Sequence, residues 1–281
     1  MSKKILIIGE NSYIGRSFFR YADSGKRFEV TAISARDGKW QHADFSQADA
    51  VLHCAGIAHV PQKKSMAGLY FDVNCRLAVD VAEKAKAAGV GQFVFLSSMS
   101  VYGQGEGVIT PCTVPMAADL YGGSKLAAEE GLRRLVAPGF DVCMVRPPMV
   151  YGAGCKGNFP RLVGLAQRLP VFPDVKNCRS MIYIDNLCEF LCQVIERSEK
   201  GVWLPQNAEY VNTAELVRLV ARLRGKRVLT TRVFNPLIGV ARRFVKPVDK
   251  LFGDLVYEKN GDEADYNVVG FEDGVRASIG V

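Results

Sequence analysis

Residues Ile5–Gly15 read Ile-Leu-Ile-Ile-Gly-Glu-Asn-Ser-Tyr-Ile-Gly, an apolar run that ends at a glycine and leads into an amphipathic stretch. This order predicts a buried strand over Lys4–Ile8, a tight turn, and a helix over Ile14–Tyr21. Glycines in such a turn let the backbone approach a pyrophosphate, which the amides of the helix N-terminus then bind. Ser12 replaces the usual middle glycine, and its hydroxyl can donate to a phosphate. The predicted cofactor-binding residues of this loop are Gly9, Ser12, Tyr13, Ile14 and Gly15.

Apolar and amphipathic stretches continue to alternate through the first two-thirds of the chain, which is typical of βαβ units around a parallel sheet. Further strands are expected at 28–34, 50–54, 92–97 and 141–146, and long helices at 69–88 and 118–136. We therefore predict an α/β fold with a doubly wound, Rossmann-like parallel sheet. Residues 1–155 are the expected dinucleotide-binding domain, with 181–205 returning to it. Residues 156–180 and 206–281 are expected to form a smaller, partly interleaved substrate-binding lobe.

Composition excludes several classes of protein. The chain has 281 residues, of which 48% are hydrophobic and 23% charged, values of a globular and not a disordered protein. No apolar run approaches the roughly 18–20 residues of a membrane helix, and the start does not read as a signal peptide. The eight cysteines form no C-x-x-C pair, which argues against a zinc ribbon and a disulfide framework. His42, His53 and His59 lack metal-ligand spacing. We expect a cytoplasmic protein without a metal.

The end of the second strand bears on the choice of dinucleotide. An NAD site usually has a carboxylate there for the ribose 2′-hydroxyl, whereas an arginine accommodates the 2′-phosphate of NADP. Ser34 occupies the expected acidic position, Arg36 follows, and Arg16 comes directly after the phosphate loop. These residues favour NADP(H) over NAD(H). In the alternative interpretation, Arg36 is a solvated turn residue and Asp37 makes the ribose contact.

The segment Tyr121-Gly122-Gly123-Ser124-Lys125 lies in a predicted helix, where a spacing of four residues places the tyrosine and the lysine on one face. An ammonium beside a phenol lowers the phenol pKa from its usual value of about 10. Tyr121 could then move a proton in a carbinol–ketone interconversion, with Lys125 holding a nicotinamide ribose. Hydroxyl groups at 97–102 end the fourth strand, at the sheet edge where α/β proteins bind ligands.

Together these segments resemble the extended short-chain dehydrogenase/reductase superfamily, in particular its epimerase/dehydratase branch acting on nucleotide sugars. The resemblance runs through nearly the whole chain and includes Glu129 and the stretch 146–152. It implies that Ser98 is the catalytic hydroxyl and that Tyr121 and Lys125 are the acid/base pair. It further implies cofactor contacts from Cys54, Ala55, Gly56 and Asn74. The paired glycines at 122–123 depart from the family pattern.

The resemblance also implies a nucleotide-diphosphate sugar as substrate. Lys156 and Asn158 lie in a stretch similar to the loop that grips the diphosphate, and Arg179 matches a phosphate-binding arginine. Arginine forks and amide donors at a helix start suit a diphosphate. The competing interpretation is that these are surface polar residues of a basic protein.

The position after Ser98 narrows the reaction. Dehydratases of the branch carry an Asp-Glu pair there, whereas this chain has Met99 and Ser100, so dehydration is not expected. A reductase of 4-keto sugar nucleotides for surface glycan synthesis is favoured by the Ser34/Arg36 pair. The alternatives are a 4-epimerase with tightly bound NAD and a non-enzymatic NADP-binding sensor.

The net charge of +7 favours an anionic partner. The diphosphate of the expected substrate is such an anion, and we expect no nucleic acid partner. Residues 236–250 combine apolar side chains, Val240, Phe244 and Val248, with arginines and lysines, so peripheral contact with an anionic membrane is an alternative role for this stretch. A homodimer that pairs through the helix at 118–136 is a further expectation from the resemblance.

Overall fold

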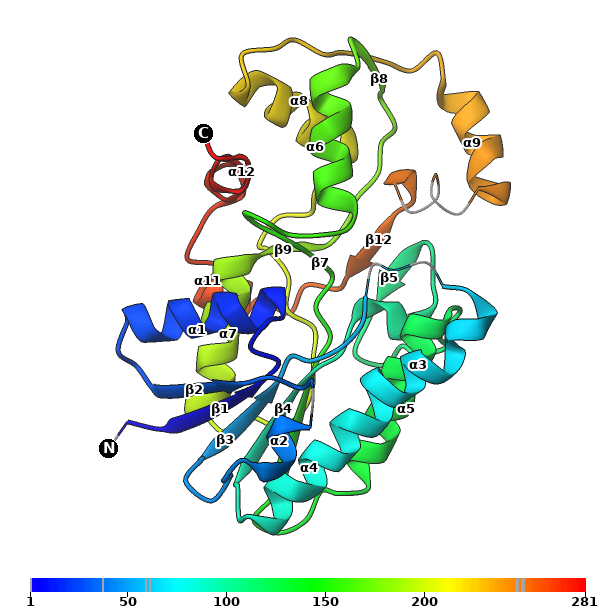
Figure 1. Ribbon diagram of the computed structural model, residues 1–281. Coiled ribbons are helices and arrows are strands. Elements are labelled where there is room, and N and C mark those ends of the chain that lie inside the picture. The colour runs from blue at the N-terminus through cyan, green and yellow to red at the C-terminus, as the bar shows by residue number, and fades with distance from the viewer. Residues whose placement is uncertain (1, 37, 59, 61, 246–247, 249–250) are drawn as a thin grey trace. The chain divides into compact units, whose positions relative to one another are not determined.

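The computed structural model describes residues 2–281 except 37, 59, 61, 246–247 and 249–250. The chain forms two compact units (Figure 1). The first unit comprises residues 1–103, 114–147 and 187–205, and the second comprises 104–113, 148–186 and 206–281. This division differs from the expected boundary at 155 and return at 181. It also assigns residues 104–113, expected in the first domain, to the second unit.

A six-stranded parallel sheet forms the centre of the first unit, which confirms the predicted fold class. The strand order across the sheet is β2 (Glu29–Ile33), β1 (Lys4–Ile8), β3 (Ala50–His53), β4 (Gln92–Leu96), β6 (Asp141–Val145) and β10 (Gly201–Trp203). The chain leaves β1 for β2 on one side and returns to β3 on the other. Such a switch point leaves a ligand crevice at the carboxyl ends of the strands. The loops after β1 and β3 lie there.

Helices cover both faces of this sheet. Figure 1 shows α4 (Leu77–Ala87) and α5 (Leu120–Arg133) on one face and α1 (Tyr13–Ser24) and α7 (Ile184–Glu196) on the other. The helix expected at 69–88 is built from α3 (Ala67–Phe71), a π-helical turn at Asp72–Arg76, and α4. Short helical segments occur at Lys39–His42 (α2), Lys64–Met66 (η1) and Met99–Tyr102 (η3). Strands β3 and β4 are buried along their whole length, as expected for a sheet covered on both faces.

In its described part, the second unit contains three two-stranded parallel sheets. They are β5 (Gly107–Ile109) with β12 (Leu255–Tyr257), β7 (Met149–Tyr151) with β9 (Met181–Tyr183), and β8 (Val171–Pro173) with β11 (Leu229–Thr231). The helices that the structure describes in this unit include α6 (Asn158–Arg168), α8 (Thr213–Leu223), α9 (Asn235–Phe244), α11 (Glu263–Tyr266) and α12 (Phe271–Ile279). Asn212 caps α8 by accepting from the Glu215 amide at 3.0 Å.

Two expectations need correction. Residues 181–205 were expected to return to the first domain, but their first strand, β9, pairs with β7 in the second unit. The strand that does return is β10, which lies beyond α7 and pairs with β6. Helix α9 ends at Phe244, so Val248 does not extend its apolar face. In the expected membrane-contact stretch, 246–247 and 249–250 lie outside the described residues, as do Asp37 and His59.

Among the described residues, no helix combines the length and apolar character needed to cross a membrane.

Candidate active site

The phosphate loop is shaped by two glycines that no larger residue can replace without movement. Gly9 has φ +112°, and a Cβ there would lie 2.7 Å from the Ala55 amide nitrogen. A Cβ on Gly15 would lie 2.7 Å from the Gly9 carbonyl oxygen. Ser12 caps α1 by accepting from the Gly15 amide at 2.9 Å. The loop after β1 is therefore packed backbone to backbone on the loop after β3, and this tight turn at a helix N-terminus fits a pyrophosphate.

The residues expected to distinguish NADP from NAD lie at the end of β2. The Ser34 hydroxyl is buried and accepts from the Arg36 amide at 3.1 Å, which closes a small turn. The side chains of Arg36 and Arg16 are exposed. The Gly9 and Glu10 amides both donate to the Ile33 carbonyl, so the phosphate loop and this turn are adjacent. Asp37, the alternative ribose ligand, is outside the described part of the chain.

The loop after β3 meets two of the predicted site residues. A Cβ on Gly56 would lie 2.9 Å from Asn74 Oδ1 and 3.4 Å from Lys125 Nζ. Buried Asn74 accepts from the Ile57 amide at 2.8 Å and donates to the Ser124 hydroxyl at 3.0 Å. It lies in the π-helical turn, a feature that often marks functional sites. Its contacts make Asn74 a positioning residue that joins the β3 loop to α5.

The structure brings Ser98 and Tyr121 together. Ser98 precedes η3, and its hydroxyl accepts from the Ser100 amide at 3.1 Å and hydrogen-bonds the Tyr121 phenol. Asp119 caps α5, so that Tyr121 lies in the first turn of the helix. A Cβ on Gly122 would lie 2.3 Å from the Ser100 carbonyl oxygen. Glycine at 122 therefore allows α5 to approach the segment that carries Ser98.

The expected lowering of the Tyr121 pKa by Lys125 is wrong for this structure. Burial raises the pKa of Tyr121, and only the hydrogen bond with Ser98 opposes that rise among the main causes. Lys125 Nζ instead donates to the Leu96 carbonyl at 2.8 Å and lies 4.5 Å from the centre of the Phe95 ring. Burial lowers the pKa of Lys125 to about 8. The phenol is therefore protonated at neutral pH.

A buried ionic network lies next to these residues. The sequence pattern does not predict that its members contact one another. Glu129 on α5 is fully buried and pairs with Arg146, which follows β6, through bonds of 2.9 and 2.5 Å. Ser97 donates to the same carboxylate at 2.5 Å, and Arg146 donates to the Tyr102 hydroxyl at 2.7 Å. These bonds hold α5 to the ends of the adjacent strands β4 and β6, and Ser98 follows β4 directly after Ser97.

His53 lies in β3 beneath the site but takes no part in a ligand cluster. Its ring is fully buried between Phe93 and Phe95, and neither ring nitrogen has a hydrogen-bond partner. Burial, with a smaller contribution from Lys125, lowers the pKa of His53 to about 3, so the ring is neutral. No group of three metal-ligating side chains occurs within the described ranges.

The predicted substrate residues all belong to the second unit. Lys156 is exposed and Asn158 begins α6 after Gly157, which has φ +97°. The first turn of α6 contains no acidic residue. Arg179 is half-buried, and its guanidinium donates to the Gly253 carbonyl at 2.9 Å. The structure thus places two of these residues beside one helix N-terminus and Arg179 on a separate segment.

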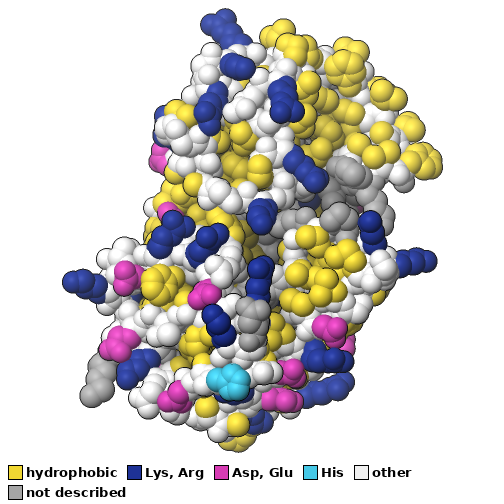
Figure 2. All heavy atoms as spheres, in the orientation of Figure 1, with side chains coloured by type: hydrophobic (Ala, Val, Ile, Leu, Met, Phe, Trp, Pro, Cys, Tyr) yellow, Lys and Arg dark blue, Asp and Glu magenta, His cyan; other side chains and the backbone are white. Residues whose placement is uncertain are grey.

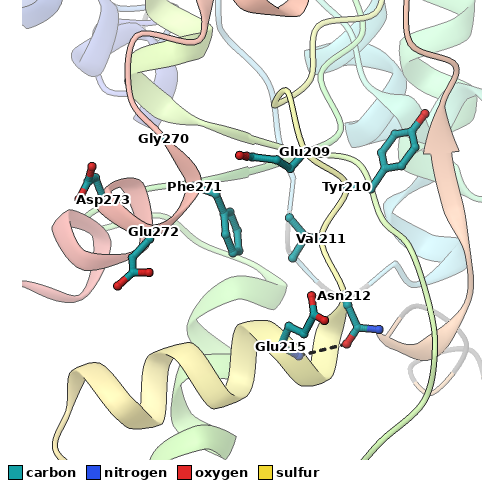
Figure 3. A pocket seen from close by; sticks show the side chains of 9 residues that line it. All are labelled: Glu209, Tyr210, Val211, Asn212, Glu215, Gly270, Phe271, Glu272 and Asp273. Carbon is teal, nitrogen blue, oxygen red and sulfur yellow. Dashed lines mark hydrogen bonds between the residues drawn. The ribbon is translucent and has the colours of Figure 1, made fainter.

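A cavity of about 470 Å³ also lies in the second unit, between the start of α8 and α12 (Figure 3). Its lining includes the carboxylates of Glu209, Glu215, Glu272 and Asp273 around the Phe271 ring. None of the predicted site residues lines it. An acidic lining repels a diphosphate, so this cavity does not suit the predicted substrate.

Comparisons with known proteins agree with this geometry. The model of the NAD dependent epimerase/dehydratase family matches residues 5–204. A UDP-glucose 4-epimerase from Vibrio cholerae is 33% identical over 256 residues, which cover 79% of this chain and 76% of that protein.

Solved structures show the same fold over nearly the whole chain. A UDP-glucuronic acid 4-epimerase from Bacillus cereus in complex with NAD superposes with a TM-score of 0.77 at 18% identity, covering 98% of this chain and 97% of that one. A dTDP-4-dehydrorhamnose reductase from Bacillus anthracis in complex with NADP gives a TM-score of 0.74 at 17% identity and covers all of both chains.

The matched family model spans well over half of the residues, from the first strand to the last strand of the main sheet. The chain therefore belongs to the NAD-dependent epimerase/dehydratase family. It is an NAD(P)-dependent enzyme of that family, in agreement with the dinucleotide cradle at Gly9 and Gly15.

Proposed function

We propose that the protein reduces a 4-keto nucleotide-diphosphate sugar to the corresponding alcohol, with NADPH as cofactor. The observation that carries this proposal is the hydrogen bond between Ser98 and Tyr121, one helical turn from a Lys125 that lies against the cofactor loop at Gly56. A nucleotide-diphosphate sugar is proposed as substrate because the relative from Vibrio cholerae is a UDP-glucose 4-epimerase.

The protonation state of Tyr121 suits reduction. A bound nicotinamide supplies the hydride, and the chain must provide a proton for the C4 oxygen. Burial raises the pKa of Tyr121, so the phenol carries that proton at neutral pH. Ser98 hydrogen-bonds the same phenol and is positioned to hold the carbonyl oxygen beside it. Lys125, buried and next to Gly56, is assigned to hold the nicotinamide ribose.

The substrate diphosphate is assigned to Lys156, Asn158 and Arg179. The start of α6 offers backbone amides without a competing carboxylate, and Lys156 adds a positive charge directly before it. Arg179 supplies a guanidinium, which suits bidentate recognition of phosphate oxygens.

NADP is preferred over NAD in this proposal because of the end of β2. A carboxylate at the end of β2 would repel the 2′-phosphate of NADP, but this chain has the neutral hydroxyl of Ser34 at that position. Arg16 and Arg36 add two exposed cations near the phosphate loop. The charge of this segment therefore favours the additional phosphate.

The second candidate is a nucleotide-sugar 4-epimerase with tightly bound NAD. The observation that favours it is the 33% identity with a UDP-glucose 4-epimerase over most of both chains. An epimerase must first remove a proton from the C4 hydroxyl, for which Tyr121 would have to be deprotonated.

The experiment that separates the two candidates is to denature the purified protein and identify any nucleotide released. We expect no stoichiometric NAD, and submicromolar to micromolar binding of NADPH to the native protein. Arg36→Ala should weaken NADPH binding by about tenfold or more, while Arg197→Ala, an exposed arginine after α7, should not. Stoichiometric NAD, or an Arg36→Ala variant with unchanged NADPH affinity, would support the epimerase instead.

A further inference from the structure

Helix α9 in the second unit exposes its apolar residues. Leu237, Val240 and Phe244 have exposed fractions of 70%, 58% and 81%. Their spacing of three and four residues places them on one helix face. Val233 and Phe234, directly before the helix, are 79% and 45% exposed. We call these five residues the α9 ridge.

Polar contacts keep the ridge turned outward. At the start of the helix Asn235 Nδ2 donates to the Asp174 carbonyl at 2.9 Å. Near its end Arg242 pairs with Glu106 at 2.5 Å, and the Arg242 side chain is only 22% exposed. A surface helix ordinarily turns its apolar face to the core and its charges to water. In α9 the ion pair faces the second unit and the apolar face points away from it.

The apolar surface extends beyond the helix. Leu229 in β11 is 71% exposed and is the register partner of Val171 in β8, which is 37% exposed. Figure 2 shows hydrophobic side chains gathered at the upper right, over the position of α9 in Figure 1. Scattered exposed apolar residues are normal, whereas a contiguous patch marks an interaction surface.

The charge of the surrounding sequence specifies the chemistry of the partner. Between Glu215 and Asp249 the chain contains no aspartate or glutamate. The same stretch contains nine cations: Arg218, Arg222, Arg224, Lys226, Arg227, Arg232, Arg242, Arg243 and Lys246. Lys226 and Arg227 are exposed close to Leu229. Arg242 is paired with Glu106, so the described positive charge beside the apolar surface comes from Lys226 and Arg227. An apolar surface with exposed cations beside it complements a partner that is apolar inside and anionic outside.

We propose that the α9 ridge binds the surface of an anionic phospholipid bilayer. Leucine, valine and phenylalanine on one face of a helix can enter the boundary between headgroups and acyl chains to a depth of about 5–10 Å. The exposed cations Lys226 and Arg227 contact the anionic headgroups. The interaction is peripheral and reversible, and it does not depend on the reaction that the first unit carries out.

The test is co-sedimentation of the full chain with vesicles of phosphatidylcholine alone or with about 30% phosphatidylglycerol. We expect binding to the anionic vesicles that weakens as salt is raised, and little binding to the neutral ones. A variant combining Leu237→Ser, Val240→Ser and Phe244→Ser should lose at least about tenfold in affinity. Because these side chains are largely exposed, their replacement should leave the circular dichroism spectrum and cofactor binding unchanged.

A matched control replaces three exposed apolar residues elsewhere, Val114→Ser, Met116→Ser and Val268→Ser, which are 74%, 74% and 55% exposed. This control should sediment with anionic vesicles as the parent chain does. Failure of the parent chain to bind them, or equal binding by both triple variants, would overturn the proposal. So would a parent chain that dimerises in sedimentation velocity through the ridge and does not bind vesicles, because a second copy would then be the occupant.

Discussion

At the scale of single residues, Glu129 and Arg146 form a buried ion pair close to the candidate site. Both side chains are almost inaccessible to water, Ser97 donates to the Glu129 carboxylate, and Arg146 donates to the Tyr102 hydroxyl. Breaking such a pair by removing one partner leaves a buried charge without compensation. Arg133 contacts the same carboxylate at 3.3 Å, but its side chain is 47% exposed.

We therefore expect Glu129→Ala to lower the free energy of unfolding by about 3–5 kcal/mol. Arg133→Ala should lower it by at most about 1 kcal/mol, since surface ion pairs contribute little. Urea denaturation followed by circular dichroism measures both values. Equal losses in the two variants would show that the buried network does not stabilise the first unit in the way described.

The buried His53 makes the free energy of unfolding fall as the pH is lowered. Its pKa in the folded chain is about 3, whereas an unfolded histidine titrates near 6.5. Between these values the unfolded chain binds more protons, so the free energy of unfolding falls as the pH falls. The contribution of this one group is at most about 1.4 kcal/mol per pH unit.

His53→Leu should remove this contribution, so that the variant loses less stability than the parent chain between pH 6.5 and pH 4.5. His42→Leu, at an exposed position on α2, should follow the parent chain. Urea denaturation at the two pH values provides the comparison. A parallel loss of stability in His53→Leu and the parent would mean that His53 does not remain neutral in the folded protein.

At the scale of helices and strands, the two adjacent glycines of α5 differ in their packing. Gly122 has no room for a side chain, whereas the position of Gly123 has. A Cβ at 122 would meet the Ser100 carbonyl oxygen at 2.3 Å, whereas at 123 its nearest neighbour would be the end of the Phe71 ring at 3.9 Å. Gly122 allows α5 to approach η3, and with it Tyr121 to approach Ser98. Gly123 has no comparable role.

Gly122→Ala should therefore displace Tyr121 from Ser98 and lower kcat by about tenfold or more. Gly123→Ala should keep kcat and raise the free energy of unfolding by up to about 1 kcal/mol, because alanine favours the helix. Steady-state kinetics and urea denaturation give both quantities. A Gly122→Ala variant with normal kcat would contradict the assigned approach of α5 to η3.

The elements that the sequence predicts correctly are those with strong local patterns. Lys4–Ile8 is a strand with the predicted bounds, because its apolar run stops at a glycine that needs φ +112°. The sheets of the second unit were not predicted, since each pairs short segments far apart in the chain. The pairing of Gly107–Ile109 with Leu255–Tyr257, for example, leaves no local signal in either segment.

The same distinction applies to the candidate site. Helical spacing pairs Tyr121 with Lys125, and the family resemblance adds Ser98 as the predicted hydroxyl. In the structure Ser98 hydrogen-bonds Tyr121, and Lys125 lies at Gly56. Spacing does not reveal that Lys125 bonds to the Leu96 carbonyl, nor that burial raises the pKa of Tyr121. Those properties depend on how deeply α5 is packed, which is a feature of the tertiary structure.

At the scale of the whole molecule, the two units carry different parts of the proposed activity. The first contains the dinucleotide cradle, the hydroxyl pair and Lys125. The family model matches residues 5–204, which take in nearly all of this unit and also residues 104–113 and 148–186 of the second. The second contains the proposed diphosphate residues and the α9 ridge. In the proposals made above, proton transfer is assigned to the first unit, and diphosphate binding and membrane contact are assigned to the second.

Proton donation by Tyr121 is the central claim, and Tyr121→Phe tests it most directly. The phenol oxygen is removed while the ring that packs against the site is retained. With NADPH saturating and a 4-keto nucleotide sugar as substrate, absorbance at 340 nm should show kcat lowered by about 10²–10⁴-fold, with NADPH affinity within a fewfold of the parent chain. A Tyr121→Phe variant that turns over at the parent rate would contradict the account.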